Sequence, residues 1–138
     1  MRKTIIAMVA VAFLAVFMAW SFMPKPEGVS KVVLEFWPHK LEVSPGILRD
    51  NDPSALKEVA VSEEDFKELE SLLSSADFKA LPDIIKADVP DGSACTQSGL
   101  TITVTFKDGT TRKVIVEGCA KEPAIVTRIF SKVSSLRQ

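Results

Sequence analysis

Few side chains in this sequence are suited to covalent or metal chemistry. His39 is the only histidine, Cys95 and Cys119 are the only cysteines, and tyrosine is absent. Three ligands scattered in this way lack the spacing of a zinc site, and the chain has no Cys-x-x-Cys redox pair. Serine catalysis would need a histidine base and an orienting carboxylate, and no Gly-x-Ser-x-Gly turn is present. We therefore expect no catalytic residue, no cofactor and no metal ion.

Carboxylates gather at a few places, each of which has a structural explanation. Residues 50–54, Asp-Asn-Asp-Pro-Ser, resemble the opening of a calcium loop, which needs glycine at its sixth position and glutamate at its twelfth. Those positions hold Ala55 and Val61, so a solvated loop is favoured. Asp91-Gly92 and Asp108-Gly109 are typical of turns.

The N-terminal segment indicates where the rest of the chain works. Arg2 and Lys3 precede an unbroken apolar run from Ile5 to Trp20, which is the arrangement of an export signal. As a helix, residues 5–23 would reach about 28 Å, close to the thickness of the hydrocarbon core of a membrane.

Three regions follow from this segment. We expect residues 1–23 to be an uncleaved anchor that binds the membrane through residues 5–23, with a signal peptide cleaved near Ser21 as the alternative. Residues 24–28 are expected to form a linker, and residues 29–138 an extracytoplasmic domain at the cell membrane, or a periplasmic or secreted domain after cleavage.

The two cysteines fit this location. An even pair in an exported chain predicts a disulfide between Cys95 and Cys119. Closing a loop of this length stabilises a fold by about 3.5 kcal/mol on the chain-entropy model. The bridge is expected to clamp the base of a hairpin.

Composition excludes one class of partner. Without Arg2 and Lys3, the chain carries 15 basic against 18 acidic residues, and no basic stripe with interleaved aromatics is present. A nucleic-acid surface is therefore not expected.

Hydrophobic periodicity predicts the elements of the domain. Strands, a capped amphipathic helix, a hairpin and a final helix follow one another, separated by polar loops. We expect strands at 31–37, 41–43 and 58–61, a polar loop at 49–54, helices at about 63–81 and 123–136, a loop at 83–99 and a hairpin at 100–117.

The hairpin is the most clearly specified element. Residues 100–106 alternate apolar and threonine side chains, so one face is apolar and the other hydroxylated. A three-residue turn at 107–109, with Gly109 left-handed, pairs Ile102 with Val114 and keeps the apolar faces together. A two-residue turn would set apolar side chains opposite charged ones.

These elements predict an α+β fold, with an N-terminal hydrophobic helix and a domain whose helices pack on one face of an antiparallel sheet. Residues 76–83, the following Asp91-Gly92 and the strand at 99–106 are similar to small exported bacterial proteins of unknown function. The resemblance covers residues 30–136 and implies the fold alone.

Two surfaces are candidates for partner contact. Trp37 is expected either to lie under the segment 41–47 or to be exposed as an anchor for a partner. Thr101, Thr103 and Thr105 should line the outer face of the hairpin. We expect a non-enzymatic, membrane-tethered or exported domain that binds a protein or an envelope component, with a small hydrolase or a structural subunit of a membrane complex as alternatives.

Overall fold

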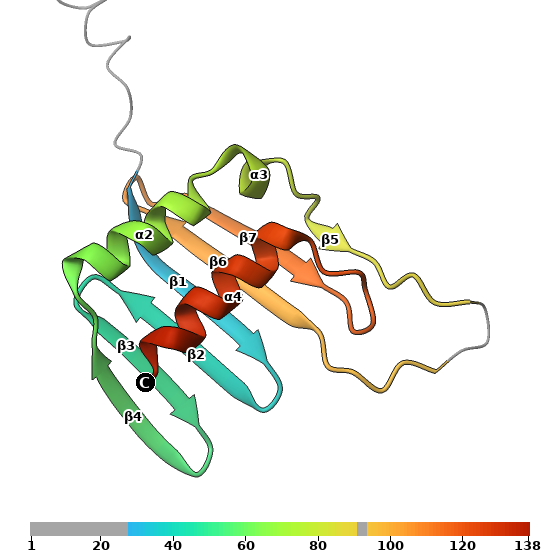
Figure 1. Ribbon diagram of the computed structural model, residues 1–138, viewed down its shortest axis with the longest axis horizontal. Coiled ribbons are helices and arrows are strands. Elements are labelled where there is room, and N and C mark those ends of the chain that lie inside the picture. The colour runs from blue at the N-terminus through green and yellow to red at the C-terminus, as the bar shows by residue number, and fades with distance from the viewer. Residues whose placement is uncertain (1–27, 91–93) are drawn as a thin grey trace, which may run out of the picture.

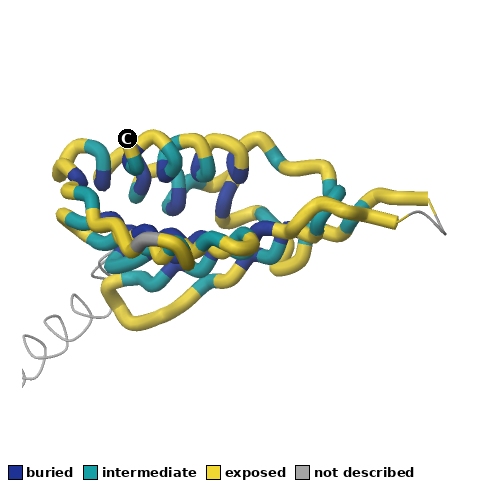
Figure 2. The backbone as a smooth tube through the Cα atoms, turned by 90° about the horizontal axis from the view of Figure 1, so that it is seen from below, coloured by how far each residue is buried: buried dark blue, intermediate teal, exposed yellow. Residues whose placement is uncertain are grey.

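The computed structural model describes residues 28–90 and 94–138, which form a seven-stranded sheet with three helices on one face (Figures 1 and 2). In chain order the elements are β1 (Val29–Phe36), β2 (His39–Ser44), β3 (Ile47–Asp52), β4 (Ala55–Ala60), α2 (Glu63–Leu73), α3 (Ala76–Lys79), β5 (Ile84–Ile85), β6 (Leu100–Phe106), β7 (Thr111–Val116) and α4 (Ala124–Leu136). The strands lie in the order β4-β3-β2-β1-β6-β7-β5, and only the short β5–β7 pair is parallel. The α+β class is therefore confirmed.

The expected N-terminal hydrophobic helix, residues 24–27 of the linker and the Asp91-Gly92 turn lie outside the described residues. Among residues 28–90 and 94–138, no helix combines the length and the apolar character that a membrane span requires.

The core lies between the sheet and the helices because apolar side chains repeat with the period of each element. In β1, Val32 and Leu34 are fully buried on the helix side, whereas Glu35 points away and is exposed. The predicted helical stripes face the same layer. From α2 the core contains Phe66, Leu69 and Leu73, and from α4 it contains Ile125, Val126, Ile129, Val133 and Leu136.

The hairpin has the predicted three-residue turn. Ile102 pairs with Val114, and Gly109 has φ +85°. The amide of Phe106 donates to the carbonyl of Thr110 at 2.9 Å, which closes the turn over residues 107–109. The prediction that apolar pairing sets the register is confirmed.

The predicted single helix at 63–81 is wrong, because α2 ends at Leu73 and α3 begins at Ala76. Each helix starts at a serine cap: the Ser62 hydroxyl accepts from the amide of Asp65, and the Ser75 hydroxyl accepts from that of Phe78. The second cap redirects the chain, and Phe78 is thereby buried.

The polar loop predicted at 49–54 is also wrong. Residues 47–52 form β3, and only the Pro53-Ser54 turn that follows is irregular. Asp50 is accepted inside the strand because it forms an ion pair with Arg137 of the α4 C-cap. Within the predicted loop 83–99, Ile84–Ile85 forms the two-residue β5, because its backbone pairs with β7.

The direction of β1 defines two ends of the sheet. β1 starts next to Gly28 and ends at the Trp37-Pro38 turn, so this turn lies at the opposite end of the sheet from Gly28 (Figure 1). The Pro53-Ser54 turn lies at the same end, since His39 is beside Asp52. We call the end formed by these two turns the distal end.

Candidate functional site

The residues suited to chemistry do not assemble into one centre. Cys95 and Cys119 are joined in a disulfide, as predicted, with their Cα atoms 6.0 Å apart. His39 instead starts β2, where its Nδ1 lies 3.7 Å from Oδ2 of Asp52. In the part of the chain that the structure describes, no three His, Cys, Asp or Glu residues are placed to hold a metal ion.

A histidine, a carboxylate and a serine do lie together at the distal end, but not as a catalytic relay. Ser54 donates from its hydroxyl to Oδ1 of Asp52 at 2.6 Å and from its amide to the same atom at 2.7 Å. These bonds lower the pKa of Asp52, and the nearby His39 adds to the effect. A nucleophilic serine must be hydrogen-bonded to the histidine base, whereas this hydroxyl is bonded to the carboxylate. The calcium-like sequence at 50–54 is thus the end of a strand followed by an Asx turn.

The disulfide lies where the segment after β5 returns to the sheet. It connects Cys95 to the turn between β7 and α4, in which Cys119 has φ 65°. The two chain segments approach so closely that a Cβ atom on Gly118 would lie 1.9 Å from the carbonyl oxygen of Gln97. The bridge therefore has a structural role at the base of the hairpin.

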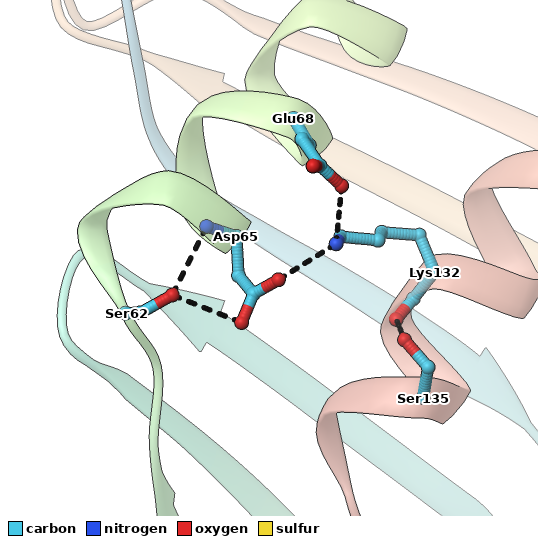
Figure 3. A network of polar contacts seen from close by, with 5 residues as sticks. All are labelled: Ser62, Asp65, Glu68, Lys132 and Ser135. Carbon is cyan, nitrogen blue, oxygen red and sulfur yellow. Dashed lines mark hydrogen bonds and ion pairs between the residues drawn. The ribbon is translucent and has the colours of Figure 1, made fainter.

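A polar network fixes α2 to α4 (Figure 3). The Lys132 ammonium contacts Oδ1 of Asp65 at 2.8 Å and Oε2 of Glu68 at 2.5 Å. These two bonds raise the pKa of Lys132, and the bond from Lys132, followed by the bond from Ser62, lowers the pKa of Asp65. An open groove runs beside the network between the two helices, and it is lined by Glu68, Ser71, Leu72, Thr127, Arg128, Ser131 and Lys132. Lys132 is already neutralised by two carboxylates, so its charge serves to join the two helices.

Trp37 is the most unusual residue of the distal end, because its side chain is 84% exposed. Burial under the segment 41–47, one of the two expectations, is wrong. Leu41 and Val43 of that segment lie in β2, point into the core and are fully buried, so they do not cover Trp37. Large aromatic side chains are highly buried on average, so this exposure needs an explanation.

The residue before Trp37 holds the turn in place. The Phe36 ring packs edge-on against Phe130 of α4 at 5.2 Å between centroids, and it lies 5.4 Å from the His39 ring. Phe36 and His39 are also cross-strand partners in the β1–β2 ladder. Trp37 is thus displayed from a well-anchored hairpin.

The three threonines of β6 lie together on the face of the sheet opposite the helices. They are half-buried, and each pairs with a residue of β1: Thr101 with Glu35, Thr103 with Val33 and Thr105 with Lys31. The described helices leave this face uncovered (Figure 2). β1 lies beside β6 on this face, and Trp37 directly follows β1. The two predicted contact surfaces therefore adjoin.

Besides Trp37, the exposed large hydrophobic residues of the described chain are Leu56, Ile84 and Val89, and the sequence prediction singled out none of them. Leu56 of the edge strand β4 is 70% exposed. The sequence carries little signal for it, because the short apolar pair Ala55-Leu56 follows a predicted loop.

Comparison with known proteins adds no likeness: no protein-family model, no curated protein and no solved structure matches this chain.

Proposed function

We propose that this chain is a non-enzymatic binding domain, anchored to the outer side of a membrane or exported across it by residues 1–23, and that its distal end binds a protein or an envelope component. The observation that carries the proposal is the 84% exposure of Trp37 on a turn that packs firmly against the core. Burying an indole gains about 25 cal/mol for each Å² of apolar surface, and tryptophan is enriched among the residues that dominate binding interfaces.

The rigid mounting of Trp37 supports the same proposal. Phe36 is held by Phe130, and the β1–β2 ladder closes directly below the turn at the Phe36–His39 pair. Because the backbone of the turn is already ordered, binding has to fix only the two side-chain torsions of the indole, so more of its burial contributes to affinity. The uncovered threonine face next to it offers hydroxyl groups as further contacts.

Photo-cross-linking in intact cells tests the proposal. A photoreactive amino acid replaces Trp37 in one variant, Thr103 in a second and Arg128, on the exposed side of α4, in a control. We expect adducts from positions 37 and 103 and none from position 128. The proposal is wrong if neither position 37 nor position 103 captures a partner.

A second experiment separates this function from a structural subunit of a membrane complex. Residues 1–23 are replaced by an unrelated membrane anchor, and the cross-linking is repeated. A binding domain keeps its adducts, because the distal end is unchanged. A structural subunit whose N-terminal segment packs against other spans would lose them.

A further inference from the structure

A pocket of about 360 Å³ lies at the end of the sheet opposite the distal end, where α2 lies over the start of β1 (Figure 1). It is formed by α2, the β2–β3 turn and the β6–β7 turn. Its lining combines apolar side chains with charges of both signs: Pro45, Val61 and Phe66 are apolar, and Glu63, Lys67, Glu70 and Lys107 are charged. We call it the proximal pocket.

The described chain begins at the rim of this pocket. The carbonyl of Gly28 accepts from the amide of Lys107 at 2.8 Å, and the amide of Val29 donates to Oε2 of Glu70 at 3.0 Å. The Lys107 side chain lies across Gly28, since a Cβ atom on Gly28 would be 2.4 Å from Cδ of Lys107. Because Lys107 and Glu70 both line the pocket, the segment that precedes Gly28 joins the domain at its edge.

Two of the four charges in the pocket lack a counter-charge. Lys67 pairs with Glu63 at 3.0 Å. Within residues 28–90 and 94–138, by contrast, neither Lys107 nor Glu70 forms an ion pair, with each other or with another side chain. The pocket therefore offers one cation and one carboxylate to an occupant that carries both signs.

The segment directly before Gly28 has this composition. Residues 24–27 are Pro-Lys-Pro-Glu, in which two proline rings alternate with one cation and one carboxylate. Proline fixes its own φ and favours an extended residue before it, so such a sequence loses little conformational freedom when it docks. Four extended residues reach about 13 Å, which is enough to enter a pocket at whose rim they are attached. The attachment also gives the segment an effective concentration on the order of millimolar, which a separate molecule would have to match.

We infer that residues 24–27 occupy the proximal pocket, with Glu27 paired to Lys107, Lys25 paired to Glu70 and a proline ring packed on Phe66. The contact sets the angle between the domain and residues 1–23, and it adds a fixed point within the chain that does not depend on a partner at the distal end. Cleavage near Ser21 would leave it intact, because residues 24–27 would stay attached to the domain.

Disulfide trapping in the full chain, kept in detergent micelles, tests where the segment lies. Pro24→Cys is combined with Lys67→Cys in the pocket or, as the matched control, with Thr105→Cys on the uncovered face of the sheet. Thr105 pairs with Lys31, three residues after Gly28, so an undocked segment would reach this position too. The two native cysteines are already joined, and only the introduced thiols are left to react.

We expect the Lys67 pair to close roughly tenfold faster than the Thr105 pair under a mild oxidant, because docking raises the effective concentration of one thiol at the other. Equal rates overturn the inference. A lipid headgroup or a second copy of the chain in the pocket would also give equal rates, since either would exclude the segment.

Charge reversal tests the pairing with Lys107. Glu27→Lys brings two like charges together and should slow closure of the Lys67 pair roughly threefold, and adding Lys107→Glu should restore the rate. Closure of the Thr105 pair should be insensitive to both changes. If Lys107→Glu fails to restore the rate, Glu27 does not lie at Lys107 and the inference is wrong.

Discussion

Arg137 places its Nη2 atom 2.5 Å from Oδ2 of Asp50, and this ion pair fastens the C-terminal end of α4 to β3. The Asp50 side chain is only 5% exposed, and its Oδ1 atom has no hydrogen-bond partner. The carbonyl of Arg137 also accepts from Nζ of Lys57 at 3.3 Å, so the helix end is held by two strands. Arg137 is therefore what makes a carboxylate tolerable inside the core layer.

Removing this cation should be costly. We expect Arg137→Met to lower the free energy of unfolding by about 3 kcal/mol, because Asp50 is left buried without its counter-charge. Urea denaturation measures the loss. The double variant Asp50→Asn/Arg137→Met should recover much of it, since no isolated charge remains. A change below about 0.5 kcal/mol for the single variant would show that the pair contributes nothing.

The link between α2 and α4 predicts a pH dependence. The lowered pKa of Asp65 means that its contribution is present above about pH 4 and is lost as the pH falls through the lowered value. The raised pKa of Lys132 means that its contribution is present below about pH 10 and is lost as the pH rises through the raised value.

Lys132→Met should therefore flatten the stability profile at both extremes. Thermal unfolding between acidic and alkaline pH provides the measurement. The control is Arg128→Met on the same helix, because Arg128 has no ion pair with another residue of the described chain. If the lysine variant and the control give the same profile, the network does not couple the helices.

The Cys95–Cys119 bridge should stabilise the fold without being needed for it. Replacing both cysteines with alanine is expected to lower stability by about 2–4 kcal/mol, since the bridge limits the unfolded chain and the core is separate from it. Denaturation midpoints with and without reductant should differ for the parent chain and coincide for the variant. Equal midpoints for the parent chain would mean that no bridge supports the domain.

Gly118 and Gly46 should differ in their tolerance of a side chain. Gly118→Ala would place a methyl group against the carbonyl of Gln97 and should cost about 2–3 kcal/mol. Gly46→Ala meets nothing within 4 Å and should cost only the strain of its φ of +88°, about 1 kcal/mol. Denaturant midpoints of the two variants give the comparison. A larger effect at Gly46 would contradict the close approach at Gly118.

Trp37 should matter for binding and not for folding. Because its side chain is 84% exposed, Trp37→Ala is expected to change stability by less than about 0.5 kcal/mol. The far-ultraviolet circular dichroism and the melting temperature should match those of the parent chain. A marked loss of stability would show that the indole packs against the domain.

The sequence predicted correctly those elements whose apolar periodicity matches the face that packs into the core. In the hairpin, alternating apolar residues and the turn at Asp108-Gly109 leave one register that pairs Leu100 with Val116 and Ile102 with Val114, and the structure has it. The predictions that failed concern residues whose structure depends on partners far along the chain. Asp50 looks like a loop residue until Arg137, far along the chain, supplies its counter-charge.

The candidate site was predictable only in part. The alternation of β1 separated Trp37 from the core face, but the sequence could not show whether the segment 41–47 would cover it. The helix break was missed although its signal was present: Ser74 and Ser75 are adjacent, and the second serine caps α3. The two-residue β5 has too few residues to form a pattern.

The position of β1 also determines how the domain would respond to a mechanical load. The strand begins beside Gly28, ends at the Trp37 turn, and is hydrogen-bonded to β2 on one side and to β6 on the other. Its eight residues extend about 26 Å. A pull between residue 28 and a ligand held at Trp37 would run along the strand. The ladder bonds lie across that direction, so both ladders would be loaded together in shear instead of opening one bond at a time.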